Sequence, residues 1–514
     1  MNPAVGMRPG SRPRNLRLVT SLAAGLLAAV ASSAAAPTLE HLFPFTFSPG
    51  STQNVTLAGK IEPWPPSLWV QGPGITWSPE TNAGKARLEI ATHATPGPRW
   101  VRLYNEDGVS DPRFILITPS ADVQEVEPNQ RPSTAQRLGT PPVRVVGRLE
   151  KSGDVDSFAL TIPAGHWLDA RLEAYVLMAK LDGVLRLLDA SGQPLAWNHD
   201  GDTLDPHLRW HATQDTNVVL QVFGFRYPAD SSVQLSGGDG AVYRLLLDAL
   251  EQAPQAIPPD SPPSDVADRS AETPAPGITP ERWITGTIAR IGEEDRHLFR
   301  AEAGDFVEAR IDAASLGSPL DATLRILDPA GAELAQADDA EGSRDPRLVW
   351  RVPTNGVYFA AVRSLLRRQD PEYRYRLTLR RLNAEARVTL ITGSVTAAPG
   401  TTNEVKFRVA RQAGHTNALQ IRFKDLPPGF TAHPVPAPAG DGEGSLTLVS
   451  ATNAAAFSGP LIVVAEDPVL GNETLVPFEM TSRGENNGVP QGYSRLWINQ
   501  IDHLWLTLRL PKEK

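Results

Sequence analysis

Three histidines lie close to acids between positions 199 and 211, a pattern that suggests metal chemistry. They are His199, His207 and His211, with Asp200, Asp202 and Asp205 among them. Zinc needs ligands that converge at about 2.0–2.1 Å, and histidine spacings of eight and four residues through a strand, a loop and a strand do not impose that convergence. The spacing therefore predicts no transition-metal site.

The motifs of nucleophilic and phosphate chemistry are missing from the sequence. The string nearest to a Gly-x-Ser-x-Gly elbow, Gly-Val-Ser-Asp-Pro at 108–112, breaks at its last position. The sequence has no His-Glu-x-x-His motif and no Gly-x-x-x-x-Gly-Lys-Ser/Thr loop. Two acids that face each other across a cleft need no fixed spacing, so a hydrolase built from dispersed acids stays as an alternative. We expect a protein that is not an enzyme.

Tryptophans near the N-terminus offer a second chemistry, which is stacking on sugars. They are Trp64, Trp69 and Trp77, and Pro63, Pro65 and Pro66 lie around the first of them. A flat indole can stack on a sugar ring, but Trp69 lies between Leu68 and Val70 in a run typical of a strand. Sugar binding and core packing both stay open for these side chains.

The elements that would position any site come from a duplication. Residues 181–192, Leu-Asp-Gly-Val-Leu-Arg-Leu-Leu-Asp-Ala-Ser-Gly, return at 320–331 as Leu-Asp-Ala-Thr-Leu-Arg-Ile-Leu-Asp-Pro-Ala-Gly, a shift of 139 positions. The matched pairs include Gly147/Gly286 and Asp156/Asp295 and, after a slip of one residue, Asp205/Asp345 and Trp210/Trp350. Turn residues and alternating apolar residues recur, whereas the three histidines do not. The duplication therefore copied a scaffold and no reactive site.

The N-terminus and the charge balance narrow the function classes. Four arginines followed by an uncharged run of small and apolar residues predict an export signal at 1–36; a membrane helix is the competing interpretation of a run that is only weakly hydrophobic. Removal of residues 1–36 changes the net charge from −9 to −13, which disfavours nucleic acid as a partner. The absence of cysteine excludes disulfides and thiol catalysis. We expect an exported protein of the periplasm, cell surface or exterior, with no transmembrane segment in the mature chain.

Short runs of alternating apolar and polar residues predict an all-β protein, a multidomain row of β-sandwich modules. The expected organisation is a signal peptide at 1–36, an immunoglobulin-like β-sandwich at 37–119, the first repeat copy at 120–250, a proline-rich linker at 251–280, the second copy at 281–381, a second immunoglobulin-like β-sandwich at 382–482 and a tail at 483–514. The tail either adds a strand to a neighbour or attaches the protein elsewhere. Arg374, Arg376 and Arg380 share one face of a strand, where we expect solvent in preference to an acidic ligand.

The first copy of the repeat unit contains Glu-Val-Glu-Pro-Asn at 125–129, Gly-Asp-Val-Asp-Ser-Phe at 153–158, the run 181–192, Asp205-Pro206 and Tyr243-Arg244-Leu245. Through these residues it resembles the bacterial pre-peptidase C-terminal domain. The second copy keeps Gly-Glu-Glu-Asp at 292–295, Leu320-Asp321 and Asp345-Pro346, and lacks the opening found at 125–129. The resemblance implies a jelly-roll-like sandwich that serves as an accessory or binding module, and it does not imply a peptidase.

Some members of that family bind calcium at the domain entrance through acids and an amide. By resemblance, the calcium ligands here are Glu125, Glu127, Asn129, Asp154 and Asp156. Ca²⁺ takes about six to eight oxygens at about 2.3–2.6 Å, and clustered carboxylates would supply several of them. The alternative is that these acids are solvated and that Asp154 and Asp156 cap the turn before Phe158. Beyond calcium, we expect no cofactor.

The function expected from the sequence is binding or display at the cell envelope or outside the cell, without catalysis. The ligand would be a protein, a polysaccharide or an envelope component. The alternatives are a secreted hydrolase, a peptidase-associated accessory protein and a structural spacer of a surface assembly.

Overall fold

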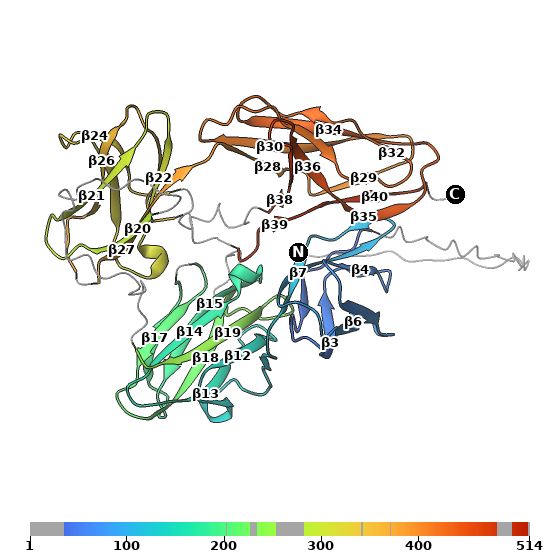
Figure 1. The fold of residues 1–514 in the computed structure, drawn as a ribbon. Helices are drawn as coiled ribbons and strands as arrows, with labels where there is room; N and C mark the ends of the chain where they lie inside the picture. The colour runs from blue at the N-terminus through green and yellow to red at the C-terminus, as the bar shows by residue number, and fades with distance from the viewer. Residues whose placement is uncertain are drawn as a thin grey trace, which may run out of the picture. The chain divides into compact units, whose positions relative to one another are not determined.

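The computed structural model describes residues 35–201, 203–226, 234–252, 282–340, 343–370, 372–480 and 496–511. The predicted signal peptide up to residue 34, most of the proline-rich linker and the start of the tail lie outside these residues. Within them the chain is all-β (Figure 1), and its helical elements are three single 3₁₀ turns, η1 (Pro132–Thr134), η2 (Tyr175–Leu177) and η3 (Ala314–Leu316). No helix of this described part has the length and apolar character needed to cross a bilayer.

Module 1 consists of two sheets of short strands. Its strands are β1 (His41–Phe43), β2 (Thr46–Phe47), β3 (Thr52–Ala58), β4 (Ser67–Val70), β5 (Ile75–Pro79), β6 (Lys85–Ile90), β7 (Gly97–Asn105), β8 (Gly108–Val109) and β9 (Arg113–Ile117). One sheet has the order β1-β3-β6-β5 and the other β2-β9-β7-β4, with β8 paired to β7. Burial alternates along β6, because every second side chain of a strand faces the core.

Modules 2 and 3 are the two copies of the repeat. Module 2 comprises β10 (Val123–Gln124), β11 (Gln136–Gly139), β12 (Val143–Arg148), β13 (Asp156–Ile162), β14 (Trp167–Glu173), β15 (Leu181–Leu188), β16 (Pro194–Asn198), β17 (His207–His211), β18 (Thr216–Arg226) and β19 (Val242–Leu250). Module 3 comprises β20 (Arg282–Thr287), β21 (Glu294–Ala301), β22 (Phe306–Asp312), β23 (Ala322–Leu327), β24 (Glu333–Ala337), β25 (Arg347–Arg351), β26 (Gly356–Ser364) and β27 (Arg374–Leu382).

The two copies share one strand order. Sheets β12-β19-β14-β17 and β13-β18-β15-β16 of module 2 correspond to β20-β27-β22-β25 and β21-β26-β23-β24 of module 3. Among the described residues, only module 2 extends these sheets, with β10 parallel to β12 and β11 parallel to β13. The segment that carries residues 125–129 therefore lies between two strands that module 3 is not seen to have.

One repeated glycine shows why the duplication kept certain residues. A Cβ atom on Gly147 would lie 2.3 Å from the Cζ atom of the buried Tyr243, and Gly286 has the same relation to Tyr375, again at 2.3 Å. Interiors packed at crystal-like density leave no room for such an atom. Both copies therefore require glycine beside the tyrosine ring.

A repeated aspartate closes the turn that follows the third shared strand. The Asp205 carboxylate accepts hydrogen bonds from the backbone N–H groups of Ala174, Tyr175 and Val176 at 3.0, 2.7 and 3.0 Å. The Asp345 carboxylate accepts them from Ala313, Ala314 and Ser315 at 3.1, 2.8 and 2.8 Å. The aspartate is kept because it satisfies backbone donors that burial would otherwise leave unpaired.

Module 4 contains three sheets and takes its last strand from the tail. Its strands are β28 (Glu385–Leu390), β29 (Ser394–Ala397), β30 (Thr402–Gln412), β31 (Gln420–Phe423), β32 (Phe430–Thr431), β33 (Val435–Pro436), β34 (Gly442–Ser450), β35 (Phe457–Leu461), β36 (Val463–Asp467), β37 (Asn472–Leu475), β38 (Phe478–Glu479), β39 (Gln500–Ile501) and β40 (Leu504–Leu508). The sheet orders are β32-β34-β30-β28-β38-β39, β29-β40-β35 and β33-β31-β36-β37. All five side chains of β40 are buried.

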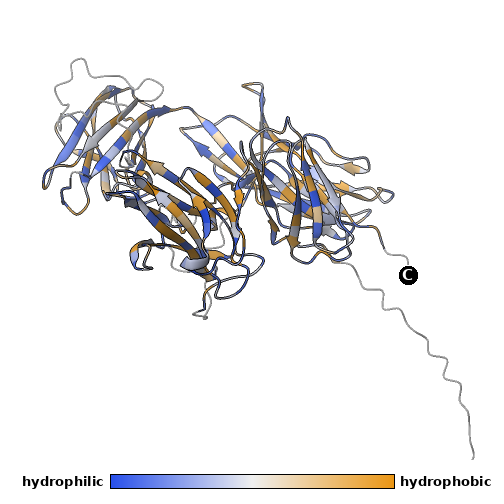
Figure 2. Cartoon of the chain, turned by 90° about the horizontal axis from the view of Figure 1, so that it is seen from below, coloured by the Kyte–Doolittle hydropathy of each residue, from blue (hydrophilic) through white to orange (hydrophobic). Residues whose placement is uncertain are grey.

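Each module has its own hydrophobic core. Separate clusters of buried residues lie in modules 1, 3 and 4, while the cluster of module 2 also includes a few residues of module 1 and Ile501 of the tail. Figure 2 shows apolar and polar residues alternating along the strands. This is the pattern of sheets with one face toward a core and the other toward water.

Candidate metal centre

The entrance segment of module 2 brings acids from two parts of the sequence together. The backbone N–H of Glu125 donates to the carbonyl of Val146 at 2.9 Å, which continues the pairing of β10 with β12. The carbonyl of Asn129 accepts from the N–H of Ser157 at 3.1 Å, next to Asp156 at the start of β13. A strand pairing with β12 at one end and a backbone hydrogen bond to β13 at the other therefore hold the segment in place.

The resulting cluster is made of carboxylates and one amide. One carboxylate oxygen from each of Glu125, Glu127 and Asp156 lies within 4.8 Å of the other two. Asn129 is fully buried, and its amide nitrogen donates to the Oε1 atom of Glu125 at 2.9 Å. The Oδ1 atoms of Asn129 and Asp156 are buried without any hydrogen-bond partner in the described part of the chain. Buried acceptors left unpaired are rare, and an unseen ion is one of the recognised reasons for them.

Burial makes the charged forms of these carboxyl groups unfavourable in free energy. It raises the pKa of Glu125 to about 7, with a further contribution from the charge of Glu127. The pKa of Asp156 is raised to about 9, mainly by burial and in second place by the charge of Glu125. The Tyr243 hydroxyl donates a hydrogen bond to the Oδ2 atom of Asp156 at 2.5 Å, which lowers this pKa in part. A cation between these oxygens would favour the charged forms and remove most of this cost.

Asp154 has a different task from the other predicted ligands. Its Oδ2 atom accepts from the N–H of Glu150 at 2.7 Å and its Oδ1 atom from the N–H of Val155 at 3.2 Å. Glu293 occupies the matching position of module 3, and its Oε2 atom accepts from the N–H of Ala289 at 2.6 Å. Asp154 therefore caps the turn beside the cluster, and the four groups that converge are those of Glu125, Glu127, Asn129 and Asp156.

Module 3 has the same buried pair of an aspartate and a tyrosine, with a histidine added beside it. The Tyr375 hydroxyl donates to the Oδ2 atom of Asp295 at 2.6 Å, as Tyr243 does to Asp156. The Nε2 atom of His297 lies 2.8 Å from that hydroxyl, at the position that Phe158 holds in module 2. The residues that would match 125–129 fall outside the described part of the chain. In module 3 an imidazole thus joins the buried acid and the phenol.

The donor set of the cluster fits a hard cation. Carboxylate and amide oxygens are the ligands of Ca²⁺, and no soft or imidazole donor belongs to the group of four. Such an ion would neutralise the acids and tie the entrance segment to β13. The Tyr243 hydroxyl was not among the predicted site residues, although the Gly147 repeat, which leaves space for its ring, is visible in the sequence.

The three histidines contact different partners. His207 Nε2 lies 2.6 Å from Asp169 Oδ1, His211 stacks near Trp167 with ring centroids 4.9 Å apart, and His199 Nε2 lies 3.2 Å from Asp182 Oδ1. Among the described residues, only His199 of the three joins a group with the spacing of a metal site, with Asp182 and Asp200, and that group is partly exposed. The histidines do not form one centre.

Charged side chains on the outer faces of modules 2 and 3 form ion pairs within the protein. Burial alone would raise the pKa of Asp169, but hydrogen bonds and charges from His207, Arg209 and Arg171 hold it below its usual range. In module 3, Arg376 pairs with Asp312 at 3.2 Å and Arg380 with Glu308. The acids that these two arginines meet belong to the protein itself.

The N-terminal tryptophans pack against other side chains. The indole N–H of Trp64 donates to the carbonyl of Glu80 at 2.8 Å, and its ring meets Trp77 edge to face at 6.0 Å. Trp69 contacts His503 and Trp505, with ring centroids at 4.5 and 5.8 Å. These contacts favour the packing interpretation over an open sugar platform.

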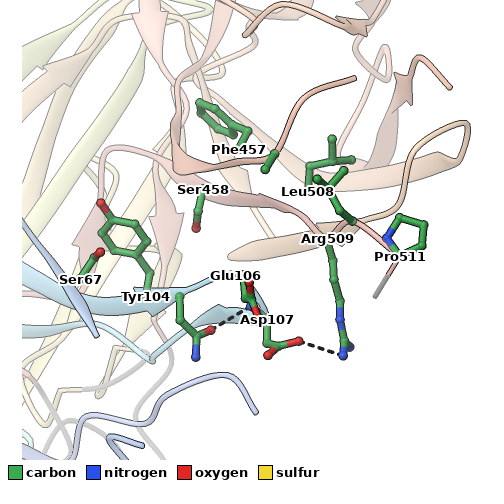
Figure 3. A pocket seen from close by; sticks show the side chains of 12 residues that line it. Ser67, Tyr104, Glu106, Asp107, Phe457, Ser458, Leu508, Arg509 and Pro511 are labelled. Carbon is green, nitrogen blue, oxygen red and sulfur yellow. Dashed lines mark hydrogen bonds and ion pairs between the residues drawn. The ribbon is translucent and has the colours of Figure 1, made fainter. Parts of the chain in front are cut away.

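A pocket of about 390 Å³ lies where the ends of β7 and β40 meet (Figure 3). Tyr104 and Phe457 supply its aromatic lining, and the carboxylate of Asp107 pairs with Arg509 at 2.8 Å. Asp107 and Arg509 of this pocket are thus engaged with each other.

Comparisons with known proteins give no family for this chain. No protein-family model matches it, and no curated protein matches it. Fibronectin(III)-like modules of CbhA from Clostridium thermocellum align at 10% identity over 41% of this chain and 88% of theirs, with a TM-score of 0.14. Domains 1–6 of the surface-layer protein SbsC align at 10% identity over 86% of this chain and 54% of that chain, with a TM-score of 0.15.

A third solved structure, the alpha-2-macroglobulin of Escherichia coli, aligns at 12% identity over 85% of this chain and 43% of that chain, with a TM-score of 0.13. The chain spans about half the length of this protein and of the SbsC domains. TM-scores of this size do not establish a shared overall fold, so the description of the fold and of the site rests on the chain's own strands and contacts.

Proposed function

We propose that this chain is an exported, non-enzymatic protein whose β-sandwich modules bind or display at the cell envelope or outside the cell, with Ca²⁺ holding the entrance of module 2. The calcium part rests on one observation. Two buried acceptors without partners, Asn129 Oδ1 and Asp156 Oδ1, belong to a cluster with two further carboxylates. The resemblance of residues 125–129 and 153–158 to the pre-peptidase C-terminal domain supports the same ion.

The binding or display role is supported by what the duplication kept. The residues shared by modules 2 and 3 include glycines beside tyrosines, turn-capping acids and core positions, whose roles in the two copies are structural. The shared acid at Asp156 and Asp295 accepts a hydrogen bond from the tyrosine hydroxyl in both copies. A scaffold repeated without reactive groups suits recognition or spacing better than catalysis.

Calorimetric titration tests the calcium proposal directly. The metal-free full-length mature chain, titrated with CaCl₂, should bind about one Ca²⁺ more tightly than Mg²⁺, because a crowded oxygen cage suits the larger ion. Glu125→Gln and Asp156→Asn should each remove this binding. Asp295→Asn, the matched change in module 3, should leave it intact.

The melting temperature provides a second readout, which distinguishes loss of ion binding from a general loss of stability in the variant. Asp156→Asn replaces a buried acid whose pKa is raised to about 9 and which must therefore take up a proton when the metal-free chain folds at neutral pH. In EDTA the variant should raise the melting temperature of module 2, and it should abolish the stabilisation by Ca²⁺. A wild-type protein that is not stabilised by Ca²⁺, or a variant that keeps the full stabilisation, would contradict the proposal.

A further inference from the structure

One sheet of module 2 carries an unusually exposed indole on its outer face. Trp197 lies on the edge strand β16 with 70% of its surface exposed, and Leu195 on the same strand is 39% exposed. Trp197 is opposite Arg186 of β15, and Arg186 is opposite Gln221 of β18. Residues opposite each other in antiparallel strands point to the same face, so these side chains form one row.

The row beneath the indole is held by hydrogen bonds. The Nε and Nη2 atoms of Arg186 donate to Gln221 Oε1 at 3.0 and 2.7 Å, and Gln221 Nε2 donates to Ser157 Oγ at 3.0 Å. The guanidinium group of Arg186 also stacks over Phe223 at 4.9 Å. The support for Trp197 is therefore fixed before any ligand arrives, which lowers the entropy lost on binding.

A polar group lies next to the aromatic part of this face. Phe225 of β18 is 40% exposed, and its ring centroid is 6.4 Å from that of His199. His199 lies 3.2 Å from Asp182 and 3.6 Å from Asp200 through its two ring nitrogens. We call the outer side chains Trp197, Phe223, Phe225, Asp182 and His199 the platform face.

Module 3 shows that the fold does not need these aromatic residues. The positions matching Trp197 and Phe223 hold Gln336 and Arg363. The arginine itself is retained as Arg325, which pairs there with Glu294 and, at 2.8 Å, with Glu333. The same face is thus an ion-paired surface in one copy and an aromatic surface in the other. Because the scaffold is common to both, packing alone does not explain Trp197.

We infer that the platform face binds a neutral polysaccharide. Sugars present apolar C–H faces, which stack on indole and phenyl rings, and hydroxyl edges, which pair with carboxylates and imidazole. Trp197 and the two phenylalanines lie two strands apart, about 10 Å, a span suited to two sugar units of one chain that are separated by a third unit.

The charges of the protein favour a neutral polysaccharide over a charged one as the ligand. The net charge of −13 expected for the mature protein repels polyanions. Arg186 is the cation of the row, and it is already bonded to Gln221. The inference rests on the proposed binding function, since it names the ligand class that this function would serve.

Affinity electrophoresis of the full-length mature protein tests the inference. Native gels would contain hydroxyethylcellulose, xyloglucan, glucomannan, laminarin or dextran as neutral polysaccharides, alginate as an acidic one and gelatin as a polypeptide. We expect retardation in at least one neutral polysaccharide and an affinity at least tenfold lower for Trp197→Ala. The matched control is Trp283→Ala, an indole of module 3 that is 46% exposed, which should behave like the wild type.

The outcomes separate this inference from the calcium proposal. Trp197→Ala should keep the stabilisation by Ca²⁺, which also shows that it folds. Absence of retardation in all five neutral gels, retardation confined to alginate or gelatin, or equal retardation of Trp197→Ala and wild type would overturn the polysaccharide inference and leave the calcium proposal standing. A wild-type protein that is retarded in a neutral gel but is not stabilised by Ca²⁺ would overturn the calcium proposal and leave the polysaccharide inference standing.

Discussion

Buried carboxylates in this protein are tolerated in three ways. Asp169 is surrounded by His207 and two arginines, which hold its pKa below the usual range despite burial. Asp205 is satisfied by three backbone N–H groups, although burial still raises its pKa to about 7. Asp156 has one phenol and several like charges, and its pKa is the highest of the three. The acid with the weakest compensation is the one placed in the proposed calcium site.

Asp295 of module 3 gives a pH-dependence that involves no proposed metal ligand. Burial raises its pKa from 3.8 to about 7, the charge of Glu293 adds to the rise, and the Tyr375 hydroxyl and Arg290 oppose it. The folded state therefore holds a proton that the unfolded state releases. The resulting stability is complete below about pH 3.8 and is lost as the pH rises through 7.

Asp295→Asn should remove this pH-dependence and keep an acceptor for the Tyr375 hydroxyl. We expect the variant to be more stable than the wild type at pH 8, by about 1–3 kcal/mol, and this advantage to be smaller at pH 5, because the unfolded wild type releases its proton progressively above about pH 3.8. Urea unfolding of module 3, followed at both pH values, measures the difference. The interpretation would be contradicted if the free energy of unfolding changed with pH as much in the variant as in the wild type. A variant that is less stable than the wild type at pH 8 would contradict it as well.

At the scale of elements, the duplicated strands and the tail behave differently. The eight strands shared by modules 2 and 3 keep their order because the repeated turn acids and glycines occur in both copies. β40 has no such local partner and finds its place between β29 and β35, far away in the sequence. Its burial is what makes the tail part of module 4.

Leu506→Ala tests how much module 4 depends on this strand. Leu506 is fully buried, so truncation should cost about 2–5 kcal/mol through lost burial and the cavity left behind. Leu510→Ala, four residues further on and 46% exposed, should change the stability by less than about 0.5 kcal/mol. Chemical denaturation of both variants provides the comparison. Equal stabilities would mean that β40 is not held in the sheet.

At the scale of the whole molecule, the important feature is that the described residues form several hydrophobic clusters, which we expect to unfold in more than one step. Modules 1, 3 and 4 have distinct hydrophobic clusters, and module 2 has the cluster nearest to the proposed ion site. Proteins with several cores rarely unfold in a single two-state step. An ion bound by one module should therefore stabilise that module more than the others.

Scanning calorimetry in EDTA and in excess CaCl₂ should show this selectivity. We expect several transitions, of which the one assigned to module 2 moves upward, by about 2.7 kcal/mol of added stability when free Ca²⁺ is 100 times the dissociation constant. Asp156→Asn identifies that transition, because it should no longer move. A uniform shift of every transition would point to general ionic effects in place of one specific site.

The sequence alone determined the class of fold and the repeat. Alternating apolar residues indicate strands because a strand presents every second side chain to the core, and the 139-residue shift predicts one scaffold used twice. The acids of 125–129 and Asp156 could also be named in advance, through their resemblance to a known domain. These features are local patterns, which are visible without coordinates.

Only the tertiary structure decided which acids converge and which aromatic residues stay exposed. Asp154 and Asp156 differ by two positions, yet one caps a turn and the other joins the buried cluster, because strand pairing brings Asn129 beside β13. Trp69 and Trp197 both lie in strands, but Trp69 meets Trp505 of the distant tail, while Trp197 is 70% exposed. Convergence and exposure depend on contacts between residues far apart in the chain, and spacing within a single segment does not encode them.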